Sequence, residues 1–150
     1  MTGSFASAHH GAPRSTLDLD LVIAPQPEQL GNFVRLLPND KYYVELEAAL
    51  EACAHQSMFN VIDIATGWKI DLIVRKSRPF SREEFERREL VDVQGLQLFV
   101  ASAEDIVIAK LEWSRMAQSQ RQVEDVAAIL KLKWNSLNKT YLDKWIKSAA

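Results

Sequence analysis

Three aspartates stand inside apolar, strand-like segments of this chain. Asp18 and Asp20 alternate with apolar residues in the segment 17–23, and Asp71 has the same setting in the segment 69–74. Side chains i and i+2 of a β-strand point to one face, about 6.5–7 Å apart along the strand. Asp18 and Asp20 therefore project together while the leucines between them pack on the other face. Because aspartate is depleted in strands and like charges on one face repel, the placement of both aspartates on one face needs a compensating gain.

The composition is that of one folded domain. The chain has 150 residues, 47% of them hydrophobic, with four tryptophans and a net charge of −2, which favours a globule and lacks the global basicity of a dedicated nucleic-acid binder. No run approaches the ~18 apolar residues of a membrane span, and the first residues do not resemble a signal peptide. We therefore expect a cytoplasmic protein with no membrane partner, in which the single Cys53 is a small core residue.

Periodicity predicts an α+β fold, a short mixed β-sheet flanked by helices. Alternation and turn signals predict strands at 17–24, 42–44, 59–64 and 68–74, with a further hairpin at 90–94 and 96–100. Helical spacing predicts helices at 4–10, 28–37, 45–54 and 81–88, the last with Ser81 and Glu84 as a capping box. Residues 1–100 are expected to form the sheet-containing core of a single domain, and 101–150 a C-terminal helical extension packed on it.

Three helices are expected in that extension. Ser102 caps the first, which runs to about Met116, and Asn138 caps the last. The expected buried residues are Val123, Val126, Ala127 and Leu130 on the middle helix and Leu142, Trp145 and Ile146 on the last. Trp113 and Trp134 are expected in the core with Trp145, and His9 and His10 on the surface.

A cluster of Asp18, Asp20 and Asp71 from neighbouring strands would supply hard oxygen ligands, which suit Mg²⁺, with Mn²⁺ as the alternative. Gly3-Ser4, at the start of the first helix, is suited to cradling a phosphate. The competing interpretation is a half-exposed strand whose polar face happens to be acidic. The pattern alone gives the two interpretations equal weight.

The order of these motifs resembles a known superfamily. Gly3-Ser4, then thirteen residues, then Asp18-Leu-Asp20-Leu and later Ile70-Asp71-Leu72 is similar to the signature of DNA-polymerase-β-like nucleotidyltransferases. Arg14 and Thr16 before the aspartate pair match the Arg-x-Thr-x-Asp-x-Asp core of the stand-alone bacterial branch. That branch is related to the AbiEii-type toxins of toxin–antitoxin and abortive-infection systems.

Two helical segments extend the resemblance to roughly residues 3–130. Ser102-Ala-Glu-Asp105 with Lys110 is similar to the superfamily's Ser-x-x-Asp…Lys-Leu helix, and Arg121-Gln-Val-Glu-Asp125 to its Arg-x-x-Asp-x-x-Asp helix. The chain departs from the second pattern, because Ala128 stands where the last acid is expected. A helix and an apolar segment precede Gly-Ser in the superfamily, whereas only Met1-Thr2 do here, so we expect either a start codon upstream of Met1 or an N-terminally trimmed relative. A shortened chain would leave apolar surface uncovered, which favours a homodimer or an exposed patch.

The resemblance implies transfer of a nucleoside monophosphate from an NTP such as ATP to an acceptor hydroxyl. The acceptor is a tRNA or other RNA end, a protein side chain or a small molecule. Asp18 and Asp20 would hold the nucleotide-bound metal, and Asp71 would bind a second metal or help to deprotonate the acceptor. The implied nucleotide-binding residues are Gly3, Ser4, Arg14, Lys110 and Asp125.

Other interpretations stay open. The chain is alternatively a non-catalytic module that binds a nucleotide or a partner, such as a cognate antitoxin, and a sugar-nucleotide transferase is a weaker third. Lys110 either binds a triphosphate or runs along apolar surface to solvent, and Arg14 either reaches a phosphate or forms a surface salt bridge. The basic residues between 75 and 88 form a solvated helix face or a rim that steers RNA.

Overall fold

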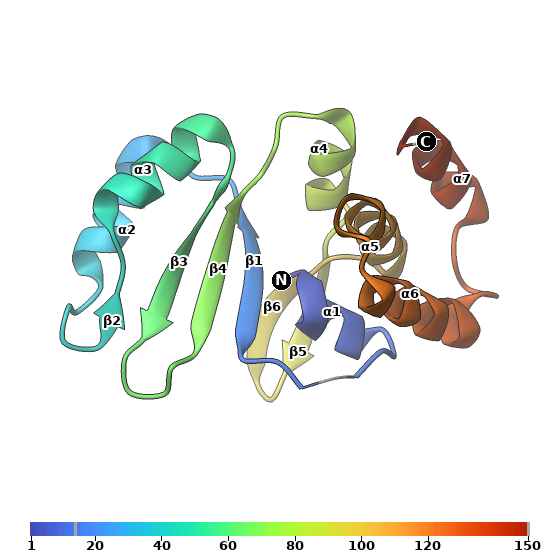
Figure 1. Ribbon diagram of the computed structural model, residues 1–150, viewed down its shortest axis with the longest axis horizontal. Coiled ribbons are helices and arrows are strands. Elements are labelled where there is room, and N and C mark those ends of the chain that lie inside the picture. Colours follow the sequence, from blue (N-terminus) through green and yellow to red (C-terminus); the bar gives the residue numbers. More distant parts are fainter. Residues whose placement is uncertain (14, 150) are drawn as a thin grey trace.

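The computed structural model describes residues 1–13 and 15–149, except for the side chain of residue 149. A four-stranded sheet lies between helices, and a separate two-stranded hairpin stands beside it (Figure 1). The sheet order is β1-β4-β3-β2, formed by Asp18–Ile23, Lys69–Val74, Met58–Asp63 and Tyr42–Tyr43. β1 and β4 are parallel, whereas β3 pairs antiparallel with both β4 and β2. The predicted α+β fold with a short mixed sheet is confirmed.

The alternating residues of β1 and β4 give the sheet two different faces. Leu21, Leu72 and Val74 point to the face covered by α2 (Pro27–Leu36) and α3 (Leu46–His55), where they form one hydrophobic core. The aspartates of β1 and β4 alternate with these residues and therefore lie on the opposite face. That face has α1 (Gly3–His9) packed against β1. The sheet thus buries its apolar side and presents its acidic side toward the N- and C-terminal helices.

The hairpin of β5 (Glu89–Val93) and β6 (Leu96–Val100) is joined to the main sheet by the start of the chain. The Met1 carbonyl accepts a 3.0 Å hydrogen bond from the Ala101 amide, and the Thr2 amide donates to the Asp20 carbonyl at 2.9 Å. Met1–Thr2 therefore bridges β6 and β1. This bridge places Gly3 directly beside the acidic face.

The C-terminal helices form a second core. α5 (Ala103–Ala117), α6 (Gln120–Lys133) and α7 (Lys139–Ala149) pack around buried residues that include Ile106, Ile129 and Trp145, together with Phe80 from α4 (Pro79–Glu86). The helical extension is confirmed as a layer beside the sheet (Figure 1). This second core holds α5, whose outer residues face the acidic side of the sheet.

Both predicted caps of the C-terminal helices are present. The Ser102 hydroxyl accepts from the Asp105 amide, and the Asn138 side chain accepts from the Tyr141 amide at 3.0 Å. The capping box at Ser81 was a wrong prediction. α4 begins two residues earlier because Pro79 occupies its first turn, which leaves Ser81 buried inside the helix.

Several burial predictions for the C-terminal helices were also wrong. On α6 the buried positions are Asp125, Val126 and Ile129, so the inward stripe is rotated away from the exposed Val123. Ile146 on α7 is 39% exposed, while Leu142 and Trp145 are buried as expected.

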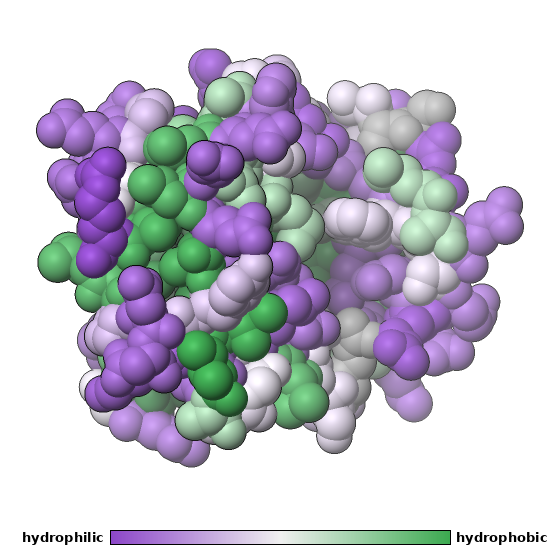
Figure 2. Space-filling view, turned by 60° about the vertical axis from the view of Figure 1, so that its left-hand side comes forward, coloured by the Kyte–Doolittle hydropathy of each residue, from purple (hydrophilic) through white to green (hydrophobic). Residues whose placement is uncertain are grey.

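Hydrophobic side chains remain on the surface of the molecule. Trp113 is 59% exposed and Trp134 is 50% exposed, which corrects their assignment to the core. Figure 2 shows one face on which hydrophobic side chains gather among hydrophilic ones. No helix in the described part of the chain is long and apolar enough to cross a membrane.

Candidate active site

The parallel pairing of β1 and β4 brings the three aspartates together. Asp20 is the register partner of Asp71, and Asp18 stands two residues earlier on the same face, opposite Lys69. Asp18 is exposed, Asp20 is partly buried and Asp71 is buried. Solvent exposure of the carboxylates therefore decreases across the site, from Asp18 to Asp71.

Asp71 has a close partner at each carboxylate oxygen. Asn60, its register partner on β3, donates through Nδ2 to Oδ1 at 2.7 Å, and the Lys69 ammonium lies 3.2 Å from Oδ2. The same ammonium lies 3.6 Å from an Asp18 oxygen. Lys69 is thus a built-in counterion between two of the three carboxylates, and its partners raise its own pKa.

Burial and neighbouring negative charges both disfavour the ionised form of Asp20. Its pKa is raised, first by burial and then by the negative charges of Asp71 and Asp18. A hydrogen bond from the Ser4 amide and the charge of Lys69 oppose that rise in pKa. A further cation beside Asp20 would relieve this repulsion.

Gly3 is required by its contact with Asp20. Its φ is +63°, in the left-handed region, and a Cβ added there would lie 1.8 Å from Asp20 Oδ2. Any other residue would therefore be strained and would displace the carboxylate. The Ser7 hydroxyl donates to the Gly3 carbonyl at 2.8 Å and fixes this first turn of α1.

Lys110 and Asp125 form a buried ion pair next to the aspartates. Lys110 Nζ lies 2.7 Å from Asp125 Oδ2 and 2.8 Å from Gln122 Oε1, and the lysine is only 5% exposed. Its stem does not carry the charge out to solvent, which corrects that alternative. Lys110 and Asp20 line one pocket of about 150 Å³. Asp125 contributes through Lys110 and does not extend the carboxylate cluster.

The hard oxygen donors of the three aspartates fit Mg²⁺ or Mn²⁺ in ligand type. Within the part of the chain that the structure describes, however, no group of three or more His, Cys, Asp or Glu side chains is arranged to hold a metal ion. The Lys69 ammonium lies among these carboxylates, 3.6 Å from Asp18 and 3.2 Å from Asp71. Arg14, the remaining residue implied to bind nucleotide, lies outside the described residues.

His10 anchors the helix that presents Gly3. The ring is buried, which corrects the surface prediction, and Nε2–H donates to the Ala101 carbonyl at 2.7 Å. Lys133 donates to Nδ1 at 3.0 Å. Burial is the main cause of the lowered pKa of His10, which keeps the ring neutral and able to accept from Lys133.

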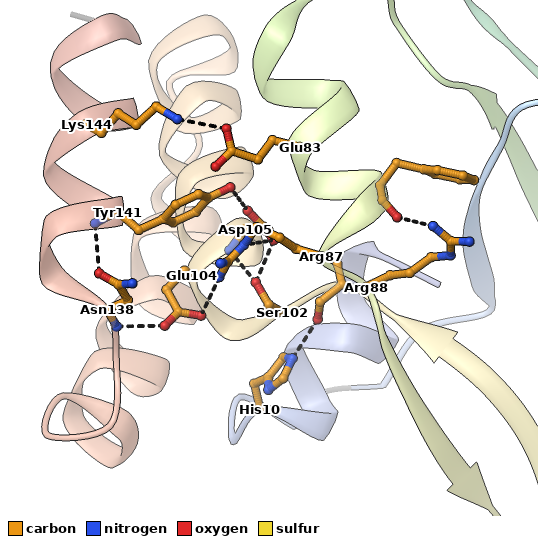
Figure 3. Close-up of polar contacts among 12 residues, drawn as sticks. His10, Glu83, Arg87, Arg88, Ser102, Glu104, Asp105, Asn138, Tyr141 and Lys144 are labelled. Carbon is orange, nitrogen blue, oxygen red and sulfur yellow. Dashed lines mark hydrogen bonds and ion pairs between the residues drawn. The ribbon is translucent and has the colours of Figure 1, made fainter.

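A buried polar network holds α5 in place (Figure 3). Both oxygens of the fully buried Asp105 are used: Tyr141 donates to Oδ1 at 2.6 Å and Ser102 donates to Oδ2 at 2.6 Å. Arg87 approaches Oδ2 at 3.4 Å, and its guanidinium stacks on the Tyr141 ring. Because Asp105 and Lys110 are on the same helix, this network also positions the lysine of the site.

Sequence reasoning missed Lys69, Asn60 and the burial of His10. Lys69 was recoverable, because it precedes Asp71 by two residues and so shares its strand face. Asn60 required the register of the β3–β4 hairpin, and His10 required the packing of α1 on α6. Neither follows from local pattern.

The fold is that of nucleotidyltransferase-like proteins. It is similar to the crystal structure of an antigenic nucleotidyltransferase-like protein from Paracoccidioides brasiliensis, with a TM-score of 0.54 and 15% sequence identity. The match covers 87% of this chain but 66% of that protein, and at this identity the likeness concerns the fold alone.

The family follows from a separate comparison. The model of the family described as "Nucleotidyltransferase of unknown function (DUF6036)" matches residues 3–149, and the chain belongs to this family. A search of curated proteins gave no match.

Proposed function

We propose that the protein is a Mg²⁺-dependent nucleotidyltransferase that moves a nucleoside monophosphate from an NTP to an acceptor hydroxyl. The observation that carries the proposal is the side-by-side placement of Asp20 and Asp71 on parallel strands, with Asp18 on the same face. Burial first, and then the negative charges of Asp71 and Asp18, raise the pKa of Asp20, and a bound cation would favour its ionised form. Membership of a nucleotidyltransferase family supports the same chemistry.

In the proposed reaction the acceptor oxygen forms a bond to the α-phosphorus, and the bond from that phosphorus to the oxygen bridging to the β-phosphate breaks. Pyrophosphate leaves with the bonding electron pair. Asp18, Asp20 and Asp71 would hold the metal, which when bound supplies Lewis-acid stabilisation of the phosphate charge. Asp71, which contacts Asn60 and Lys69, accepts either a cation or the hydroxyl proton.

The remaining roles follow from the pocket around Asp20. Gly3 and Ser4 line it, and the missing side chain at Gly3 lets the Asp20 carboxylate lie against their backbone, beside the proposed position of the phosphate. Lys110 lines the same pocket and supplies a positive point charge for the triphosphate. Asp125 is a positioning residue, because it orients the Lys110 ammonium. Arg14 remains a proposed phosphate contact by resemblance alone.

The test is transfer of label from an NTP labelled at its α-phosphate, with Mg²⁺ present. Asp18→Asn and Asp20→Asn should abolish transfer, while Asp143→Asn on the outer face of α7 serves as the matched control. Wild-type transfer by the Asp20→Asn protein would sink the assignment.

A second candidate is a non-catalytic nucleotide- or partner-binding module, related to AbiEii-type systems and held by a cognate antitoxin. The position of Lys69 favours it, since this ammonium already neutralises Asp18 and Asp71. Calorimetry with Mg²⁺–NTP separates the two candidates: binding without turnover supports the module. An antitoxin reading frame beside this one would support the toxin–antitoxin setting.

A further inference from the structure

Two pockets meet beside the acidic face of the sheet. The first, of about 150 Å³, contains Asp20 and Lys110. The second, of about 130 Å³, contains Arg75 and Lys76 at the end of β4. Four residues border both pockets: Thr2, Ile73, Ala109 and Trp113. The pockets therefore form one groove that runs outward from the aspartates.

The outer half of this groove carries more basic than acidic side chains, because Arg75, Lys76 and Arg78 line it together with Glu84 and Glu112. Arg78 in the same pocket is paired with Glu112 through two hydrogen bonds of 2.9 and 2.6 Å. Arg75 instead lies over the Phe85 ring, 5.2 Å from its centroid. Among the described residues, neither Arg75 nor Lys76 forms a salt bridge with an acidic side chain. These two cations are available to an anionic ligand.

Trp113 stands where the two pockets join. It lines both of them and yet is 59% exposed, so packing in the hydrophobic core does not explain why a tryptophan lies at this position. An exposed aromatic ring next to cations that lack carboxylate partners is the combination that binds single-stranded nucleic acid. The bases stack on the ring and the phosphates meet the cations.

We propose that this outer pocket is the acceptor subsite and that it takes the 3′-terminal nucleotides of a single-stranded RNA. A terminal base stacks on Trp113, and the phosphates on its 5′ side contact Arg75 and Lys76. This seats the terminal ribose at the junction with the Asp20 pocket, where its hydroxyl is the acceptor. The subsite rests on the proposed function for its role in the reaction, but RNA binding is measurable without turnover.

The first test measures binding of a 5′-labelled single-stranded RNA of about ten nucleotides by fluorescence anisotropy without NTP. Trp113→Ala should weaken binding about 5- to 160-fold, whereas Trp113→Phe should retain most of it. Trp134→Ala is the matched control, since this tryptophan is also half-exposed but lines neither pocket. Circular dichroism establishes that each variant is folded.

The second test uses salt. Arg75→Ala with Lys76→Ala should reduce the slope of log affinity against log salt concentration by about 1.4, from about 0.7 for each phosphate contact with a single strand. Trp113→Ala should leave that slope unchanged. Equal RNA binding by the Trp113→Ala and Trp134→Ala proteins overturns the subsite, and so does tighter binding of the matching DNA or duplex.

Transfer assays separate failure of the subsite from failure of the proposed function. Labelled NMP appearing on the RNA 3′ end with wild type, and lost with Trp113→Ala, supports both. NMP transfer to a protein or small molecule, with no RNA binding, overturns the subsite and leaves the nucleotidyltransferase assignment standing. RNA binding that depends on Trp113, with no NMP transfer, overturns the proposed function and not the binding surface.

Discussion

Replacing Glu84 by glutamine should stabilise the protein at high pH and have much less effect at low pH. Glu84 lies on α4, where burial and then the charge of Asp105 raise the pKa of its carboxyl from 4.5 to about 7. Arg78 opposes this rise and Glu112 adds to it. The folded protein therefore holds the Glu84 proton more tightly than the unfolded chain does.

The sign and size of the effect of Glu84 on the unfolding free energy follow from the linkage between protonation and folding. A raised carboxyl pKa means that the native state binds more protons, so its free energy of unfolding falls as pH rises from 4.5 to 7 and is then constant. At 1.36 kcal/mol for each pH unit, the destabilisation is on the order of 3 kcal/mol above pH 7 and less than about 1 kcal/mol at pH 5. Glutamine has nearly the same shape and no charge, so Glu84→Gln removes the pH-dependent part.

Urea unfolding of both proteins at pH 5 and pH 8.5 measures the effect. The gain in unfolding free energy from Glu84→Gln should be larger at the higher pH by about 2–3 kcal/mol. Any cost of burying the amide is the same at both pH values and cancels in that difference. Glu86→Gln, on the exposed side of α4, is the control and should show no such difference. Equal effects of Glu84→Gln at the two pH values would refute the reasoning.

Three further substitutions test the packing around the site. Tyr141→Phe removes the hydroxyl that binds the buried Asp105 and should lower the unfolding free energy by about 1.5–3 kcal/mol in urea titrations. Lys110→Met removes the ammonium bound to the buried Asp125 and should lower the unfolding free energy by about 3–5 kcal/mol. Adding Asp125→Asn to this variant should recover part of the lost unfolding free energy. If the double variant shows no recovery, the two residues are not a coupled pair. Ile129→Ala, at a fully buried position, should lower the unfolding free energy by about 2–5 kcal/mol, which thermal unfolding measures. An unchanged midpoint temperature would contradict close packing around Ile129.

The strands and the acidic face were predictable because they depend on local alternation. Once Asp18 and Asp20 alternate with leucines, period two fixes which residues share a face, and the structure has that arrangement. The parallel pairing that aligns Asp20 with Asp71 is a long-range choice of topology. The strand pattern does not specify this pairing.

The wrong burial predictions concern side chains whose burial depends on helices or loops from elsewhere in the chain. Trp113 and Trp134 lie at helical spacing, but that spacing does not say whether a neighbour covers them, and half or more of each residue is exposed. His10 has the opposite outcome, because α6 and Ala101 surround a ring that local sequence places at a helix end. Local pattern assigns faces, and tertiary packing decides which faces are buried.

Helix α5 links the stability of the helical layer to the geometry of the site. Near its start Asp105 binds Tyr141 of α7, one turn later Lys110 binds Asp125 of α6, and Trp113 follows on the groove side. These residues are three to five positions apart, so a shift of α5 moves the proposed triphosphate contact and the proposed base-stacking ring together. The C-terminal helices are therefore one wall of the site, and loosening the Tyr141 contact should weaken binding at Lys110 and Trp113 even though Tyr141 lines neither pocket.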